Sequence, residues 1–222
     1  TYLDWKEKFG LEIYEGLGTT EMMFVFISAA VTKKVKPGWI GSACPGYDVR
    51  VINESFERVK PGEVGKMIVQ GPTGTIYWKD NDKQKSAVRD GWCLAGDVVT
   101  MDEDGYIQFL SREDDLIKSS GYRIGPEEIE EALVTHPSVA DAGVVGGPDP
   151  VIGQKTKAFV QLKPGVAASE ELKKELVEHC KGKIAVYKLP RDIEFIDAMP
   201  RTAVGKLLRR ILRQQEVEKS KK

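Results

Sequence analysis

The residues best suited to chemistry gather between residues 111 and 130. Arg112 precedes a run of carboxylates, small turn-forming residues follow at 119–121, and Arg123 stands just before an expected helix. A guanidinium presents paired N–H donors that match phosphate oxygens and can also reach ribose oxygens. The segment could therefore fix a hinge and bind a nucleotide, although a solvated hairpin with salt bridges accounts for the same residues equally well.

Three other segments combine glycine with hydroxyl, acidic or basic side chains. Residues 15–21 read Glu-Gly-Leu-Gly-Thr-Thr-Glu, residues 91–97 read Gly-Trp-Cys-Leu-Ala-Gly-Asp, and residues 200–206 read Pro-Arg-Thr-Ala-Val-Gly-Lys. Taken singly, each has a plainer interpretation, because a Gly-Asp pair such as the one ending at Asp97 is common in turns and Lys206 could be a surface lysine. Their order along the chain gives them weight.

In this order the four segments resemble the motifs of the adenylate-forming superfamily, which includes acyl-CoA synthetases, luciferases and peptide-synthetase adenylation domains. Residues 15–21 are similar to its nucleotide-binding Tyr-Gly-x-Thr-Glu motif, and residues 91–97 to its Trp-x-x-Thr-Gly-Asp motif. Residues 111–130 resemble its hinge motif, and residues 200–206 its catalytic-lysine motif. The resemblance implies that a carboxylic acid and ATP form an acyl-adenylate and pyrophosphate. A small C-terminal domain then rotates, and a thiol, usually that of coenzyme A, displaces AMP.

The resemblance also implies a nucleotide site. Asp97 would accept hydrogen bonds from the ribose hydroxyls, and Arg112 would add a donor to the same ribose. Arg123 would face the ATP phosphates in one of the two rotational states. The residues assigned to the nucleotide are Glu15, Gly16, Leu17, Gly18, Thr19, Thr20, Asp97, Arg112 and Arg123. Glu21 would help to hold Mg²⁺, a hard cation that prefers oxygen ligands shared with phosphates.

Lys206 is the catalytic residue that the resemblance implies. Attack on the α-phosphate builds negative charge that an ammonium can stabilise, and losing such a group typically costs on the order of 10²–10³ in rate. Asp114 matches the pivot of the hinge, while Ser120, Gly121 and Tyr122 match the loop that lines the pantetheine channel. The plainer alternatives are a hairpin turn and a cross-strand packing tyrosine. The expected cofactors are therefore ATP, Mg²⁺ and coenzyme A.

Three positions depart from the superfamily pattern. Leu17 stands where relatives often carry an aromatic residue, so aliphatic contact would replace stacking on the base. Ala95 replaces the usual threonine of its motif, and Ser111 stands where glycine is common. None of these changes removes a residue that the chemistry requires, but each alters a detail of the nucleotide site.

A phosphate-binding loop ending in lysine is expected far upstream of the first motif, and nothing in the chain matches it. Residues 71–75 are glycine-rich but lack that lysine, and we interpret them as a β-turn. The chain is therefore expected to be the C-terminal two-fifths of an acid–CoA ligase, missing the N-terminal portion of the same chain and inactive alone. Residues 119–126 and 136–140 look most like medium-chain acyl-CoA and benzoate-type ligases.

The elements that must position these motifs change character near residue 111. Alternating apolar residues predict strands at 49–52 and 66–69 and a hairpin over 98–110, so residues 1–111 are expected to be rich in β structure. The resemblance implies that they are the remaining part of a large N-terminal domain. Residues 112–222 are expected to form a small α+β domain, which the resemblance implies is mobile. Its predicted elements are a helix from Pro126, strands at 139–145, 156–162 and 193–196, a helix capped by Ser169, and a last helix around 208–212 before a frayed tail from Glu216. The predicted fold class is α+β.

The composition excludes several classes of protein. With 33 basic and 34 acidic residues, the chain gives no electrostatic reason to expect nucleic acid or an anionic membrane as a partner. The longest apolar run, residues 22–31, is too short to span a bilayer, and the charged first twenty residues do not resemble a signal peptide. Three scattered cysteines predict neither a metal site nor a disulfide framework, so a cytoplasmic protein is expected.

Several functions remain open on the sequence. The favoured partner is a small-molecule carboxylic acid, medium-chain acyl or aryl, beside ATP and coenzyme A. An adenylating relative with another acceptor thiol is one alternative, and an inactive interaction module that kept the fold is another. The joint presence of Asp97, Arg112 and Lys206 favours the enzyme, because a scaffold needs none of them. Nucleic-acid binding by the basic residues after Lys206 is disfavoured, since they alternate with leucines and lack aromatic stacking partners.

Overall fold

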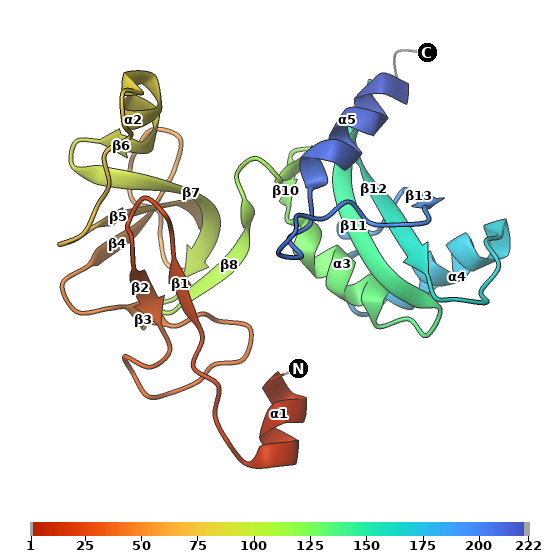
Figure 1. Cartoon of the computed structure of the whole chain (residues 1–222), viewed down its shortest axis with the longest axis horizontal. Helices are drawn as coiled ribbons and strands as arrows, with labels where there is room; N and C mark the ends of the chain where they lie inside the picture. Colours follow the sequence, from red (N-terminus) through yellow and green to blue (C-terminus); the bar gives the residue numbers. More distant parts are fainter. Residues whose placement is uncertain (1, 220–222) are drawn as a thin grey trace. The chain divides into compact units, whose positions relative to one another are not determined.

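The computed structural model describes residues 2–219 and divides into two compact units, residues 1–113 and 114–222 (Figure 1). The predicted α+β fold class is confirmed, with sheets dominating. The expected domain boundary, after residue 111, lies two residues too early. Ser111 and Arg112 belong to the first unit because they end a strand that pairs there with Val98 and Asp97.

Two antiparallel sheets and two short helices make up the described part of the first unit. Their bounds are α1 (Tyr2–Phe9), β1 (Gly16–Gly18), β2 (Val25–Ser28), β3 (Ser42–Ala43), β4 (Asp48–Ile52), β5 (Val64–Gln70), α2 (Asn81–Ala87), β6 (Val88–Arg89), β7 (Trp92–Met101) and β8 (Ile107–Arg112). One sheet runs in the order β1-β2-β3, and the other in the order β4-β5-β7-β6 with β8 beside β7. Both strands and the hairpin predicted for this region are confirmed.

The core of the first unit joins these two sheets. Phe26 and Ile27 of β2 are fully buried and pack with Met67 of β5 and Ile107 of β8. In β7 the inward residues Cys93 and Ala95 alternate with more exposed neighbours, as the two-residue period of a strand requires. The sequence that carries the Gly-Asp motif is thus held rigidly in the middle of a sheet.

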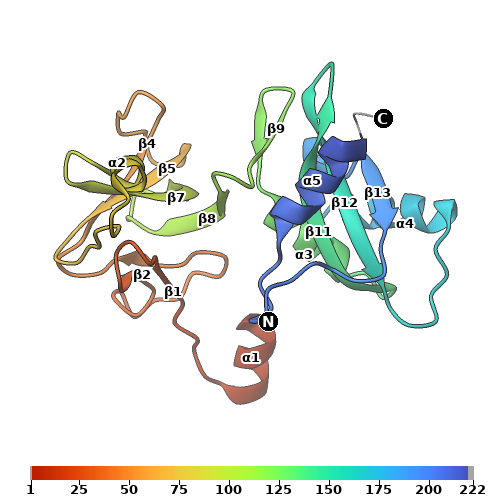
Figure 2. The ribbon, with the colours of Figure 1, turned by 45° about the horizontal axis from the view of Figure 1, so that its top comes forward.

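The second unit is a sheet covered on both faces by helices (Figure 2). Its elements are β9 (Ile117–Ser119), β10 (Tyr122–Ile124), α3 (Pro126–Val134), β11 (Val139–Asp149), β12 (Gly153–Leu162), α4 (Glu170–Cys180), the 3₁₀ helix η1 (Val186–Lys188), β13 (Asp192–Phe195) and α5 (Arg209–Lys219). The strand order is β10-β9-β12-β11, and β13 runs parallel to β12. Val144 and Val160 face α3 and α4. Their neighbours along each strand, Val145 and Phe159, point to the other face and pack against Leu212 of α5.

Local signals explain where the helices of this unit begin. Pro126 occupies the first helical position of α3, where its missing N–H costs nothing. The Ser169 hydroxyl caps α4 by accepting a hydrogen bond from the Leu172 N–H at 3.1 Å. Both helices therefore start where the sequence predicts.

Three local predictions are wrong. The strand expected to close at residues 146–149 continues through them as β11, because they pair in register with β12 down to the Asp149–Gly153 pair. The described part of the tail, residues 216–219, is helical and not frayed, because α5 reaches Lys219 and Glu216 is buried. Residues 220–222 lie outside the described residues. Residues 71–75 form an extended loop, not a β-turn, and the Thr73 hydroxyl donates to the Met22 carbonyl at 2.5 Å.

The helices of the described chain are short. Within residues 2–219, none is both long enough and apolar enough to cross a bilayer.

Candidate functional site

The first nucleotide motif forms the β1–β2 hairpin of the first unit. A Cβ on Gly16 would lie 2.9 Å from Val25 Cγ1, and one on Gly18 would lie 2.6 Å from the Phe24 carbonyl oxygen. Glycine is required at both positions because β2 approaches this closely. After β1 the chain turns, and the Met22 N–H donates to the Thr19 hydroxyl at 3.3 Å. The remaining motif residues, Glu15, Leu17 and Thr20, lie in the same hairpin, with Leu17 packed against the core.

The second motif delivers a buried carboxylate to a guanidinium. Asp97 of β7 and Arg112 of β8 are cross-strand partners. Asp97 is 3% exposed, and its Oδ1 accepts a hydrogen bond from Arg112 Nη1 at 2.7 Å. The same nitrogen donates to the Ala95 carbonyl at 2.7 Å. Gly96 has φ +70°, and a Cβ there would lie 2.9 Å from Arg112 Nη2, so the guanidinium folds over this glycine.

Glu21 lies close enough to this pair for the charge of Arg112 to affect its pKa. Burial alone would raise the pKa of Glu21. Hydrogen bonds from Tyr77, from its own backbone and from Thr19, together with the positive charge of Arg112, outweigh burial and lower the pKa below its ordinary value. The carboxylate is therefore ionised at neutral pH. The structure thus brings together Thr19, Glu21, Asp97 and Arg112, which the sequence assigned to the nucleotide and the metal.

Oxygen donors of this kind fit a magnesium ion. Mg²⁺ in nucleotide sites is usually held by one or two carboxylates and by the phosphates of the substrate. Within residues 2–219, no group of three or more acidic, histidine or cysteine side chains is arranged to hold a metal by itself. Glu21 could therefore hold the ion only together with the phosphates of a bound nucleotide.

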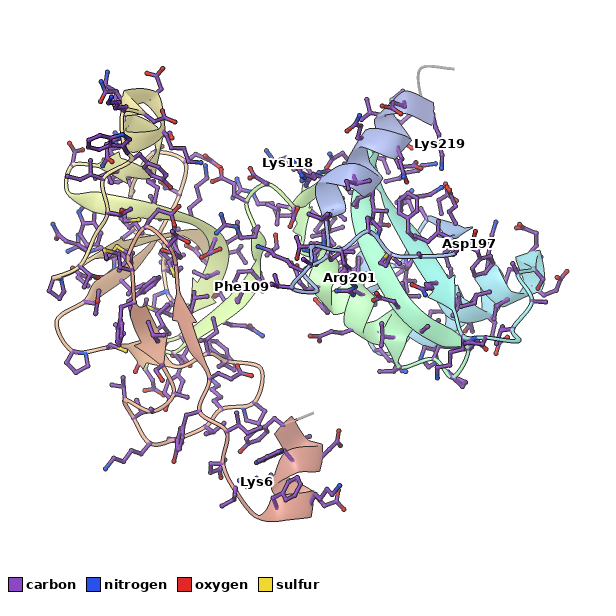
Figure 3. All side chains as sticks on the ribbon, viewed as in Figure 1. Lys6, Phe109, Lys118, Asp197, Arg201 and Lys219 are labelled. Atoms are coloured by element: carbon purple, nitrogen blue, oxygen red, sulfur yellow. The ribbon has the colours of Figure 1, made fainter. Side chains whose placement is uncertain are left out.

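The loop that carries Lys206 is braced from both sides. The Thr202 N–H donates to the Lys206 carbonyl at 2.8 Å, and the Lys206 N–H donates to the Thr202 hydroxyl at 3.0 Å. Arg201, labelled in Figure 3, binds both carboxylate oxygens of Asp141 through Nη2, at 2.6 and 2.8 Å, and donates from Nη1 to the Gly205 carbonyl at 2.6 Å. The loop is thereby tied to β11.

The Lys206 side chain itself points into solvent. It is exposed, and within residues 2–219 its ammonium makes no hydrogen bond or ion pair. A fixed backbone and an exposed ammonium suit a lysine that binds a phosphate group.

The hinge segment begins the second unit. The carbonyl oxygen of Asp114 accepts a hydrogen bond from Arg213 Nη1 of α5. The next residue, Asp115, accepts from Arg213 at 2.9 Å and from Arg209 at 3.0 Å. Arg209 also binds Glu130 of α3 at 2.6 Å. The second-unit side of the expected pivot is therefore anchored to two helices.

The predicted coenzyme A loop is a two-residue hairpin. Ser120 has φ +49° and Gly121 has φ +81°, and they join β9 to β10 where Ser119 pairs with Tyr122. Positive φ at both positions is the mark of a type I′ turn. Tyr122 is 52% exposed and stacks on Tyr187 of η1, with ring centroids 4.3 Å apart. Its partner is thus not the cross-strand residue of the plainer alternative.

The candidate residues divide between the two units. Those assigned to adenine, ribose, α-phosphate and metal lie in the first unit, apart from Arg123 of β10, which lies in the second. Lys206, Asp114 and the hairpin at residues 120–122 also lie in the second unit.

Two families of known proteins match this chain. The family described as "AMP-binding enzyme" matches residues 1–78. The family described as "AMP-binding enzyme C-terminal domain" matches residues 128–206, so that match ends at Lys206. This chain belongs to the AMP-binding enzyme family. The resemblance found in the sequence is confirmed.

Individual relatives of this chain are named as acyl-CoA synthetases or CoA ligases. The mitochondrial acyl-coenzyme A synthetase ACSM3 of Mus musculus is 43% identical over 220 residues, which is 96% of this chain and 38% of that protein. The crystal structure of the anthranilate CoA ligase AuaEII in complex with anthranoyl-AMP is 36% identical, with a TM-score of 0.85 over 97% of this chain and 42% of that one. The o-succinylbenzoate coenzyme A synthetase MenE from Bacillus subtilis, in complex with ATP and magnesium ion, is 29% identical, with a TM-score of 0.81 over 97% of this chain and 43% of that one. The chain thus spans about two-fifths of the relatives' length.

Several residues that hold the candidate site in place could not be recognised from the sequence. Arg201 lies inside a motif that the sequence singled out, yet nothing local shows that it reaches Asp141 sixty residues away. Arg213 is one of the basic residues after Lys206, and nothing local shows that it reaches Asp114 and Asp115. Tyr77, which donates to Glu21, and Tyr187, which stacks on Tyr122, belong to no motif recognised in the sequence. These contacts form only when distant segments meet.

Proposed function

We propose that this chain is the nucleotide-holding and lysine-bearing part of an AMP-forming acid–CoA ligase. The observation that supports the proposal is the buried Asp97 carboxylate, paired with the more exposed Arg112 guanidinium and with Glu21 close by. Asp97 would accept from the ribose hydroxyls, and Arg112 would donate to the ribose. Residues 15–20 would line adenine and the α-phosphate.

The chemistry of the proposed reaction has two steps. A carboxylate oxygen of the acid attacks the α-phosphorus of ATP, and the bond to pyrophosphate breaks. Lys206 would stabilise the negative charge that builds on the phosphate oxygens in this step. The sulfur of coenzyme A then attacks the acyl carbon, and AMP leaves with the oxygen that the acid supplied. A magnesium ion at Glu21 would neutralise phosphate charge when bound.

Substrate and acceptor are inferred from the relatives. One relative is named as an acyl-coenzyme A synthetase and another as an anthranilate CoA ligase, which supports an acyl or aryl acid as substrate. The hairpin at residues 120–122 is the proposed contact for the pantetheine arm of coenzyme A, and Asp114 the proposed pivot. We expect the isolated chain to show no turnover, because it spans only about two-fifths of the relatives' length. A cytoplasmic location stays a prediction.

The test uses the full-length protein that contains this chain. Pyrophosphate release is measured with ATP, coenzyme A and a panel of carboxylic acids, for the wild type, Lys206→Ala and the matched control Lys174→Ala. Lys174 is also an exposed lysine without a partner among the described residues, and it lies on α4. We expect release that depends on one class of acid, falls about 100-fold or more in Lys206→Ala and is unchanged in the control. A folded protein that releases no pyrophosphate with any acid would contradict the proposal and favour the inactive interaction module.

A further inference from the structure

The hydroxyl of Tyr77 donates a hydrogen bond to Glu21, the carboxylate assigned to the metal. Tyr77 lies in the loop that precedes α2, and its hydroxyl donates to Glu21 Oε1 at 2.6 Å. This distance is in the short range found when a hydroxyl donates to an ionised acceptor. The two residues are 56 positions apart in the chain.

The loop around Tyr77 is itself anchored. The Tyr77 N–H donates to the side-chain oxygen of Gln84 in α2 at 2.9 Å. Earlier in the loop, the Thr73 hydroxyl donates to the carbonyl of Met22, the residue after Glu21. The loop is therefore tied to the first nucleotide motif at two neighbouring points. Glu21, Thr73 and Tyr77 line an open pocket of about 280 Å³.

A carboxylate held in this way is prepared to bind a cation. An unrestrained glutamate loses rotamer freedom when it becomes a ligand, and a fixed one has already lost it. Groups that hydrogen-bond to a ligating carboxylate orient it, and their removal typically lowers metal affinity by about 10- to 100-fold. Tyr77 shares Glu21 with Thr19 and with the Glu21 backbone, and it is the donor that comes from a distant segment of the chain.

We propose that Tyr77 is a positioning residue for the divalent cation: it fixes Glu21 so that this carboxylate is presented to the metal that accompanies ATP. The inference rests on the proposed function, since it assigns Glu21 to that metal. Tyr77 makes no contact with the cation itself. Its effect is therefore expected in the concentration of metal that the protein requires, more than in the rate once metal is saturating.

The experiment compares Tyr77→Phe with Tyr106→Phe in the full-length protein. Tyr106 is the matched control because it is also a tyrosine of the first unit, and its hydroxyl donates to Thr32 Oγ1 at 2.8 Å. The first readout is the Mg²⁺ concentration that gives half-maximal acid-dependent pyrophosphate release at saturating ATP. The second needs no turnover: the amount of Mn²⁺ retained with the protein in the presence of ATP, measured by rapid ultrafiltration and compared with the same solution without protein.

We expect Tyr77→Phe to raise both metal concentrations by about 10- to 100-fold and Tyr106→Phe to change them by less than about twofold. In a Glu21→Gln background the additional effect of Tyr77→Phe should vanish, because the two residues act as one unit. A folded Tyr77→Phe protein with the wild-type metal dependence, or with a purely structural loss of stability, overturns the proposal.

The two proposals fail in different ways. Wild-type protein that binds Mn²⁺ and ATP, loses that binding in Tyr77→Phe, but releases no pyrophosphate with any acid, would refute the ligase and leave the role of Tyr77 standing. Wild-type protein that binds no Mn²⁺ in the presence of ATP would refute the role of Tyr77.

Discussion

Replacing Lys157 by methionine is expected to destabilise the second unit by about 3 kcal/mol, whereas Lys155→Met should cost less than about 1 kcal/mol. Both lysines lie on β12 and both reach Asp192, at 3.0 Å from Lys157 and 3.2 Å from Lys155. The Lys157 side chain is only 7% exposed and also lies 3.0 Å from Glu194 and 3.6 Å from Glu216 of α5. The Lys155 side chain is 33% exposed.

The difference in burial sets the two magnitudes. Removing one partner of a buried ion pair typically costs about 3–5 kcal/mol, because the other charge stays behind unpaired. Asp192 and Glu194 are one-third exposed, with exposed fractions of 34% and 32%, and each keeps a second lysine, Lys155 or Lys219, so the lower end applies. Methionine keeps the apolar stem of Lys157, so little packing is lost. The pair that Lys155 makes with Asp192 is one-third exposed on both sides and belongs with surface ion pairs, which contribute at most about 1 kcal/mol.

The effect of Lys157→Met should depend on pH. Burial raises the pKa of Asp192 and of Glu194, but hydrogen bonds from lysines, including Lys157, outweigh burial and hold both pKa values below their ordinary range. A depressed carboxyl pKa gives stability that is present above the ordinary pKa and is lost as the pH falls through the native one. The difference between wild type and Lys157→Met should therefore shrink below about pH 4.

The assay is urea unfolding of this chain, followed by far-UV circular dichroism and by hydrogen exchange of the β12 amides. All four tryptophans, Trp5, Trp39, Trp78 and Trp92, lie in the first unit, so tryptophan fluorescence is an internal control that should not move. Equal losses in Lys157→Met and Lys155→Met, or a loss that does not vary with pH, would refute the reasoning.

Three further predictions concern other parts of the chain. Burial, only partly opposed by the Arg209 charge, raises the pKa of Glu127 from 4.5 to about 7, so stability should fall as the pH rises through this window. In Glu127→Gln this fall, measured by urea unfolding at pH 5 and pH 8, should disappear, and a persistent fall would point to another group. Arg201→Gln should lower pyrophosphate release by the full-length protein about tenfold while changing stability by less than about 1 kcal/mol, and an unchanged rate would show that the braced loop is unnecessary. Burial raises the pKa of Cys93 to about 11, so iodoacetamide at pH 7.5 should label it, as judged by mass spectrometry, much more slowly than in urea, and equal rates would contradict its burial.

Much of the fold could be predicted because the deciding signals are local. Pro126 followed by two glutamates starts α3, and Ser169 caps α4 through a hydrogen bond to a residue three positions away. The loop at residues 102–105 closes the β7–β8 hairpin, where the Asp102 side chain accepts from the Tyr106 N–H at 2.8 Å. Such contacts depend on neighbours in the sequence, so composition and spacing suffice.

The errors arise where distant segments decide the outcome. A Gly-Gly-Pro-Asp run at residues 146–149 is typical of a turn. It instead pairs with β12, because it continues a ladder of ten residue pairs between β11 and β12. Glu216 looks like part of a charged tail, but Lys157 and the packing of α5 bury it. The hydrogen bond between Tyr77 and Glu21 spans 56 residues and has no local signature. The motifs predict which residues do chemistry, and only the fold shows which residues hold them in place.

The central claim, that this chain belongs to an enzyme that activates a carboxylic acid by transfer of AMP, is tested most directly by following an oxygen atom. The full-length protein is given ATP, coenzyme A and its acid labelled with ¹⁸O in the carboxylate, and the products are weighed by mass spectrometry. The account predicts AMP that carries one ¹⁸O, because the acid oxygen attacks the α-phosphorus and leaves with AMP. Label in inorganic phosphate beside unlabelled ADP, or unlabelled AMP, would contradict it.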